Sequence, residues 1–259
     1  MISLTIADGI AEVVLDAPQK LNSLDEQALQ DLAQAYDDAA DAAARGEVRA
    51  LLLRGEGRAF CAGRDIAGVT PESDDAQAYL GGLVQPLLKK MSSFPAPTFA
   101  AAQGACLGVG LGLLLATDVV YVADTAKFGS PFAKLGATLD SGGHWYFTER
   151  LGMHRTLDLI YTAELMSGAE AVAQGLFSRA MPADELLENT RGIVAKVATG
   201  ATGAFNASKE LVAQIRDQRL GLWEAMEEEN AEQARLCKSE DYAEGFRAFQ
   251  EKRTPVFKG

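Results

Sequence analysis

The sequence predicts an α/β fold that ends in a helical region, and two observations carry this prediction. In the first half of the chain, short apolar runs alternate with segments whose apolar residues recur at helical spacing. After Leu157 the strand-like runs fade, and almost all of the chain from Leu186 onward has a helical pattern. The chain has 259 residues, 48% of them apolar, so it can bury a sizeable core.

The elements expected in the first hundred residues follow one another closely. Two short strands, Met1–Ile6 and Ile10–Leu15, flank the turn "ADG" and predict a hairpin. A helix is expected over Asp25–Ala44, with a possible cap at Ser23. A buried strand in "VRALLLRGEG", a loop in "RAFCAGRDIAG" and a helix over Gln77–Met91 come next.

The middle of the chain is rich in glycine. Strands are expected in "TFAAAQG" and "DVVYVAD", and "ACLGVGLGLLLAT" between them predicts a turn that enters a short apolar helix. Further on, "SGAEAVAQG" predicts a Ser-capped helix that ends at Gly175. We place the strand-containing core over residues 1–195 and the C-terminal helical region over residues 196–259.

Composition excludes several classes of protein. The formal net charge of −12 argues against nucleic acid as the main partner, because phosphate backbones need basic surfaces. No apolar run is long enough to span a membrane, and the N-terminus does not resemble a signal peptide. Three cysteines and two histidines lack the spacing of a metal site. We therefore expect no metal and a location in the reducing cytoplasm.

Two glycine-containing loops are candidates for a site. The run "GACLGVGLG" leaves backbone N–H groups bare at a helix start, which suits a phosphate or an oxygen that gains negative charge. A dinucleotide fingerprint with Asp124 would need a third glycine where Leu113 stands. Close packing of strand and helix also explains the run. In "AFCAGRDI" a ligand can approach the backbone at Ala62–Gly63, or the segment is an ordinary exit loop with a packed Cys61.

The two loops and their surroundings resemble the crotonase superfamily of enoyl-CoA hydratases and isomerases. The likeness covers nearly the whole chain, through "LDAPQKLNSL", "GEGRAFCAGRDI", "QGACLGVGLGLLLATD", "FGSPFAKLGATLDSGG" and "FRAFQEKRTPVFKG". It implies a crotonase-like spiral of ββα turns, with C-terminal helices that pack onto neighbours in a trimer or a dimer of trimers. It also implies acyl-CoA thioesters as substrates, with coenzyme A as part of the substrate and no other cofactor.

The resemblance also assigns residues. The family's oxyanion hole falls on the backbone N–H groups of Arg64 and Val109. Because coenzyme A is polyanionic, local cations must bind it, and the candidates are Lys20, Arg64 and the basic end "EKRTPVFKG". In the family, an adenine wall and a C-terminal tail, which in some members comes from a neighbouring subunit, also contact coenzyme A. The wall and the tail correspond to Ala62, Asp65, Ile66, Phe257 and Lys258. A solvated basic end is the alternative for the tail.

The sequence departs from the hydratases of the family at two positions. Those enzymes activate water with two glutamates, and the matching positions hold Gly112 and Phe132. Asp140 instead falls where dienoyl-CoA isomerases and the epoxyphenylacetyl-CoA isomerase carry their acid. The "DSGG" run followed by Trp145 is most similar to the latter type.

Asp140 therefore becomes the expected acid and base of an isomerase. A single carboxylate can remove a proton from one carbon and return it to another. An apolar wall would raise its pKa above the usual value of about 3.9. Alternatively, Asp140 only caps the following helix. His144 is four residues further on and either assists or only packs. A hydratase and a catalytically inactive acyl-CoA-binding protein remain alternative functions.

Overall fold

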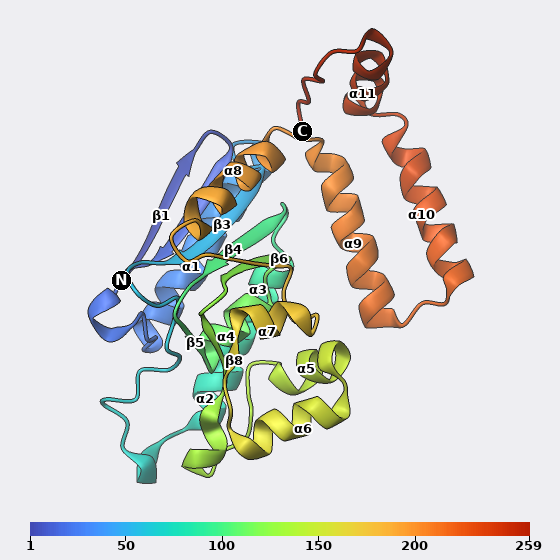
Figure 1. Ribbon diagram of the computed structural model, residues 1–259. Coiled ribbons are helices and arrows are strands. Elements are labelled where there is room, and N and C mark those ends of the chain that lie inside the picture. The colour runs from blue at the N-terminus through green and yellow to red at the C-terminus, as the bar shows by residue number, and fades with distance from the viewer.

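The computed structural model describes residues 1–259 and confirms a mixed α/β fold with a helical C-terminal region (Figure 1). The main sheet has six strands in the order β1-β2-β3-β4-β6-β9. β1 and β2 form an antiparallel hairpin, and all the other pairs are parallel. The strands are β1 (Ile2–Ala7), β2 (Ile10–Leu15), β3 (Ala50–Gly55), β4 (Thr98–Ala102), β6 (Val119–Ala123) and β9 (Arg179–Met181).

A second, smaller sheet has three strands in the order β5-β7-β8. β5 pairs in parallel with β7, and β7 pairs antiparallel with β8. Along the chain, β4 is followed by β5 and a helix, and β6 is followed by β7 and a helix, which is the ββα repeat that the sequence predicts. The three strands are β5 (Ala105–Leu107), β7 (Lys127–Gly129) and β8 (Met166–Ser167).

Seven helices before residue 180 and four after it complete the chain, and a turn of π-helix at Leu80–Val84 joins two of the first group. The first group is α1 (Glu26–Ala44), α2 (Ala76–Tyr79), α3 (Gln85–Ser92), α4 (Val109–Leu115), α5 (Gly143–Leu151), α6 (Met153–Thr162) and α7 (Gly168–Ala173). The second group is α8 (Leu186–Ala198), α9 (Thr202–Gln218), α10 (Leu222–Leu236) and α11 (Glu240–Glu251).

Most local predictions are confirmed, and one cap is corrected. Asp8 and Gly9 have φ values of 52° and 75°, the left-handed pair that a two-residue hairpin turn needs. The cap of α1 is Asp25, whose carboxylate accepts the Ala28 N–H at 2.8 Å, so the prediction of Ser23 was wrong. The Ser-capped helix is α7, where Ser167 forms a capping box with Glu170.

The core lies between the main sheet and the helices on its faces. α8 packs on β3 and β4, and α1 packs against the hairpin strand β1. All five residues of β4 and all seven of α4 are buried. α4 is therefore an internal helix, because its Leu and Val side chains contribute to the core on every side.

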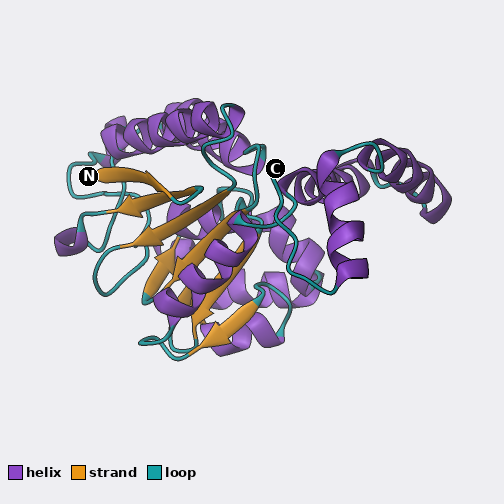
Figure 2. Cartoon of the chain, turned by 90° about the horizontal axis from the view of Figure 1, so that it is seen from above, coloured by secondary structure: helices purple, strands orange, loops and turns teal.

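The last three helices stand away from this body. In Figures 1 and 2, α9 and α10 form an antiparallel pair beside the sheet domain, and α11 lies at the far end of α10. The predicted boundary between residues 195 and 196 lies inside α8, and the projecting helices begin at Thr202. Their surface carries large exposed apolar side chains, such as Trp223 at 73% and Phe249 at 85% exposure. No helix combines the length and apolar character that crossing a bilayer requires.

Asn22 fastens the segment before α1 to the exit of β3. Its side-chain oxygen accepts the Ala17 N–H at 2.8 Å, and its amide donates to the carbonyls of Glu56 and Ala59 at 2.9 and 2.8 Å. The residue is 1% exposed and has φ of 57°, a conformation that Asn tolerates better than most residues. The loop that carries Arg64 begins at this anchor.

Replacing Asn22 with Leu should therefore destabilise the fold. The change removes the partner of two buried groups, the Ala17 N–H and the Ala59 carbonyl, and of the partly buried Glu56 carbonyl. At about 1–3 kcal/mol for each buried group, the loss should be on the order of 3 kcal/mol. The measurement is the denaturation midpoint in urea. Asn230→Leu, on the exposed face of α10, is the matched control and should shift stability by no more than about 0.5 kcal/mol. Equal effects of the two changes would contradict the anchor.

Candidate active site

The segment that carries Arg64 runs between two backbone neighbours. On one edge, Cys61 N–H donates to the Ala105 carbonyl and Leu107 N–H donates to the Cys61 carbonyl, both at 3.0 Å. On the other edge, Leu24 forms a parallel bridge with Arg64. The loop after β3 is thus held alongside β5, which leads directly into α4.

Glycines allow this approach. A Cβ atom on Gly63, which has φ of +100°, would lie 2.9 Å from the Leu107 carbonyl oxygen. A Cβ on Gly110 would lie 2.5 Å from the Cys61 carbonyl oxygen. Side chains at these positions would force the two backbones apart, since real Cβ contacts are longer. The loop and the first turn of α4 therefore meet backbone to backbone.

Two backbone donors remain free at this contact. Leu24 bonds the Gly63 carbonyl and the Asp65 N–H, so in a strand-like segment the N–H of Arg64 points to the opposite edge. Val109 is the first residue of α4, and its N–H lies outside the helical ladder. Neither N–H donates to another backbone group. The structure thus brings the two predicted oxyanion donors together on neighbouring segments.

Asp140 is half-buried on the approach to α5 and does not serve as that helix's side-chain cap. The N-cap of α5 is Gly142, and no side chain bonds the free N–H groups of the first turn. The Asp140 carboxylate accepts the Ser141 hydroxyl at 2.8 Å, while only its backbone carbonyl accepts the Gly143 N–H. The capping alternative therefore has no support from the carboxylate.

The surroundings of Asp140 favour its protonated form. Burial raises the pKa of the Asp140 carboxyl above its usual value, and this effect outweighs the Ser141 hydrogen bond and the charges of Arg64 and His144, which lower it. A higher pKa makes the carboxylate a stronger base and a better proton donor near neutral pH. His144 itself is exposed, with its ring 3.3 Å from the Thr138 hydroxyl.

Of the two positions that the resemblance matches to hydratase glutamates, position 112 has no room for a side chain, because a Cβ on Gly112 would lie 2.4 Å from the Cβ of Ser141. The other position holds Phe132, whose ring packs on Gly108, where a Cβ would lie 3.0 Å from it. Ser141 has φ of 52°, an uncommon conformation for serine. Sequence reasoning missed Ser141, because nothing in "LDSGG" reveals which residue takes the left-handed conformation.

The Arg64 side chain has neighbours that sequence reasoning also missed. Its guanidinium forms a two-point ion pair with Asp74, at 2.9 and 2.6 Å, and lies 4.1 Å from the centre of the Tyr79 ring. Tyr79 is 3% exposed, and burial raises the pKa of its hydroxyl. Neither residue belongs to a recognisable motif. Cys61 is fully buried and its thiol pKa is raised to about 12, as a packed cysteine requires.

Four of the residues assigned to coenzyme A lie together. Lys20 pairs with Asp25 and Asp65, each at 3.1 Å, so two carboxylates already hold its ammonium group. Ala62 and Asp65 are half-buried on the same loop, and the neighbouring Ile66 is 60% exposed. The ion pair between Lys20 and Asp65, and the bond from the Ala62 N–H to the Leu21 carbonyl, hold these residues together beside Arg64; we call Lys20, Ala62, Asp65 and Ile66 the Lys20 surface.

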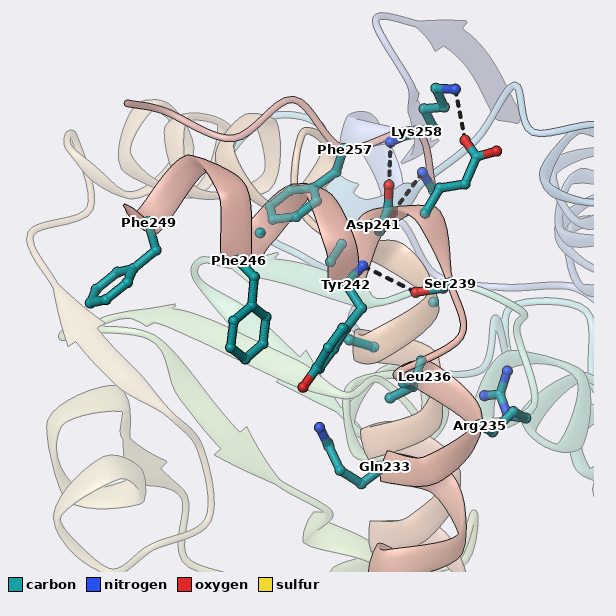
Figure 3. A pocket seen from close by; sticks show the side chains of 16 residues that line it. Gln233, Arg235, Leu236, Ser239, Asp241, Tyr242, Phe246, Phe249, Phe257 and Lys258 are labelled. Carbon is teal, nitrogen blue, oxygen red and sulfur yellow. Dashed lines mark hydrogen bonds and ion pairs between the residues drawn. The ribbon is translucent and has the colours of Figure 1, made fainter. Parts of the chain in front are cut away.

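Phe257 and Lys258 lie elsewhere in the protomer. Figure 3 shows them in a pocket of about 780 Å³ between α9, α10, α11 and the tail. The Lys258 ammonium donates to Glu240 at 2.7 Å, and its backbone N–H donates to Asp241. In Figure 1 the C-terminus lies at the opposite end of the molecule from α2. Within one protomer, the tail and the Lys20 surface do not meet.

Comparisons with known proteins match the chain over almost its full length. A family model described as enoyl-CoA hydratase/isomerase matches residues 5–259. A protein of Rhodobacter capsulatus named as a probable enoyl-CoA hydratase is 36% identical, over 98% of this chain and 96% of its own. The 1,2-epoxyphenylacetyl-CoA isomerase of Escherichia coli is 28% identical, over 98% and 97%. A crystal structure of enoyl-CoA hydratase from Bacillus anthracis superposes with a TM-score of 0.90 at 28% identity, covering 100% and 99%.

The contact between Gly112 and Ser141 gives a direct test of the site's packing. Gly112→Ala should displace Ser141 and with it Asp140, and should cost about 1–3 kcal/mol as an overpacked core position. Gly82→Ala is the control, because a Cβ there meets nothing within 4 Å. Thermal unfolding of both variants measures the difference. If Gly112→Ala is as stable as the parent, the close packing around Asp140 is not as described.

Proposed function

This chain belongs to the enoyl-CoA hydratase/isomerase family, and we propose that it is an acyl-CoA isomerase that acts through Asp140. In this proposal it shifts a double bond or opens a ring epoxide in the acyl group. The observation that carries the proposal is a single half-buried carboxylate with a raised pKa, without a capping role, near two unpaired N–H donors. Gly112 and Phe132 supply no second carboxylate for water activation.

The chemistry follows from these groups. Removing a proton next to a thioester carbonyl places negative charge on the carbonyl oxygen. The N–H groups of Arg64 and Val109 would stabilise that enolate, and each fixed donor contributes on the order of 3–4 kcal/mol. Asp140 would take the proton from one carbon and return it to another, so the reaction consumes no water. No cofactor is needed beyond the coenzyme A of the substrate.

A hydratase is the second candidate, because relatives such as the Rhodobacter capsulatus protein are named as hydratases. It would have to activate water with Asp140 and Ser141 alone. A panel of acyl-CoA thioesters, including phenylacetyl-derived and unsaturated fatty acyl groups, separates the candidates by mass. A hydratase adds 18 Da, an isomerase leaves the mass unchanged, and an inactive acyl-CoA-binding protein changes neither mass nor absorbance.

The coenzyme A site is proposed on the Lys20 surface, with Ala62, Asp65 and Ile66 as the adenine wall. Phe257 and Lys258 would join it only from a neighbouring subunit, since the Phe257 carbonyl accepts from Arg49 just before β3, whereas Lys20 pairs with Asp65 beyond the other end of that strand. We place the enzyme in the cytoplasm, as expected for an acyl-CoA enzyme with three free cysteines, of which Cys237 is exposed.

The exposed apolar residues of the projecting helices predict self-association. Leu222, Trp223 and Phe249 are all more than 60% exposed, and burying them at about 25 cal/mol per Å² favours assembly. Light scattering at micromolar concentration should give the mass of a trimer or hexamer. A monomer under these conditions would refute the assembly and, with it, the contribution of the neighbour's tail.

Asp140→Asn tests the proposed base. Asn has nearly the same size and should leave folding unchanged, while kcat on the identified substrate should fall by roughly a hundredfold to ten-thousandfold. Because the base works when ionised and its pKa is raised, the parent's kcat should be lost on acidification at a pH above about 3.9. Asp184→Asn, on an exposed turn, is the control. A folded Asp140→Asn variant that keeps more than about a tenth of parental kcat would exclude the mechanism, since that loss is only ~1.4 kcal/mol.

A further inference from the structure

The side chain of Arg64 is clamped in place by groups that take no part in the proposed proton transfer. Two of its nitrogens donate to the Asp74 carboxylate, and the Tyr79 ring lies beneath the guanidinium at 4.1 Å. The ring is itself fixed, because the Tyr79 hydroxyl donates to the Leu24 carbonyl at 3.2 Å. The remaining donor, Nε, is buried without a partner.

This clamped charge lies on the same side of α4 as Asp140. A Cβ on Gly63, the residue before Arg64, would lie 3.8 Å from the Cα of Gly108, the N-cap of α4. A Cβ on Gly112, one turn further along the same face, would lie 2.4 Å from Ser141, the residue after Asp140. The two segments therefore flank one helix, one turn apart. Both Arg64 and Asp140 lie close enough to Tyr79 to act electrostatically on its hydroxyl.

We propose that the Arg64 side chain, clamped between Asp74 and Tyr79, is a positioning residue that supplies Asp140 with a fixed positive neighbour. Through this neighbour it determines over which pH range the Asp140 carboxylate is available as a base. The role is separate from that of the Arg64 backbone N–H, and its catalytic consequence rests on the proposed function of Asp140.

The groups that face Asp140 support a role for charge. Arg64 comes from the loop after β3, Tyr79 from α2, His144 from α5, and Ser141 from the adjacent position. Burial raises the pKa of Asp140, and Arg64 and His144 both lower it. The charge of Arg64 is constant, because a guanidinium stays protonated at every working pH.

The unpaired Nε is consistent with this role. A buried donor without an acceptor costs stability, so a long polar side chain is poorly explained here by packing alone. Asp74 binds the two outer nitrogens and offsets part of the positive charge without removing it. The electrostatic field at Asp140 therefore depends on both members of the ion pair. Removing the Arg64 charge and removing the Asp74 charge should shift the titration midpoint of Asp140 in opposite directions.

The test measures the ionisation of Asp140 directly in the substrate-free protein. Carbon-13 NMR of aspartate labelled at the side-chain carboxyl follows the titration, and Asp140→Asn identifies the signal. Arg64→Gln keeps the backbone donor but removes the charge, so the Asp140 midpoint should move to higher pH. Asp74→Asn removes the offsetting negative charge, so the midpoint should move to lower pH.

Lys134→Gln is the matched control, because it also removes one positive charge from a segment close to Asp140 in sequence. It should leave the Asp140 midpoint unchanged. Arg64→Lys should restore the midpoint toward the parental value, and it carries the test if Arg64→Gln does not fold. An unchanged midpoint in Arg64→Gln, equal shifts in Arg64→Gln and Lys134→Gln, or shifts of the same sign in Arg64→Gln and Asp74→Asn would each overturn the inference.

Turnover separates this inference from the proposed function. If Asp140 is the base, the acid limb of the kcat profile should move in Arg64→Gln by the same amount and in the same direction as the NMR midpoint. A midpoint that moves while the acid limb stays in place would reject Asp140 as the base but leave the positioning role of Arg64 intact.

Discussion

The candidate site depends on one close backbone contact, between the loop after β3 and the first turn of α4. β3 and β4 are neighbours in the main sheet and run in parallel, so the segments that leave their carboxyl ends emerge side by side. Gly63 and Gly110 then allow the two backbones to touch. Without that contact the N–H groups of Arg64 and Val109 would not lie on adjoining segments.

The same helix start also limits what chemistry the site can support. Ser141 fills the space beside Gly112, and the Phe132 ring packs on Gly108. A glutamate at position 112 would require Ser141 to move, and Ser141 is the hydroxyl that binds Asp140. The packing that supports the single carboxylate thus excludes the second one. The steric constraint at Gly112 therefore supports the proposed proton transfer, which needs only one carboxylate.

Sequence reasoning succeeded where a residue's role depends on its neighbours in the chain. The hairpin turn at Asp8–Gly9, the glycine-rich entry to α4 and the capping box of α7 are local features with local causes. It missed the strands β5, β7, β8 and β9, which have two or three residues each and are too short to show a period. It chose Ser23 instead of Asp25 as a cap because both residues suit that role.

The residues of the candidate site also fall into two groups, those that the sequence indicates and those whose roles appear only in the fold. Asp140 could be found from its spacing to Phe132, because the resemblance fixes positions along the chain. Tyr79, Asp74 and Ser141 could not be found, since their roles arise only when three separate segments meet around α4. Asn22 lay within a motif, but its three hydrogen bonds to distant carbonyls and an N–H became visible only in the fold.

The positive charges available to coenzyme A link its proposed site to the proposed oligomer. Coenzyme A is polyanionic and the chain carries a net charge of −12, so binding must rely on a few local cations. Lys20 is held by two carboxylates, and Lys258 is paired with Glu240 at the other end of the protomer. Exposed pairs of this kind are worth little and exchange readily for a phosphate. A neighbour's tail placed beside Lys20 would add a cation to the Lys20 and Arg64 of one protomer, so the proposed coenzyme A site and the proposed oligomer support each other.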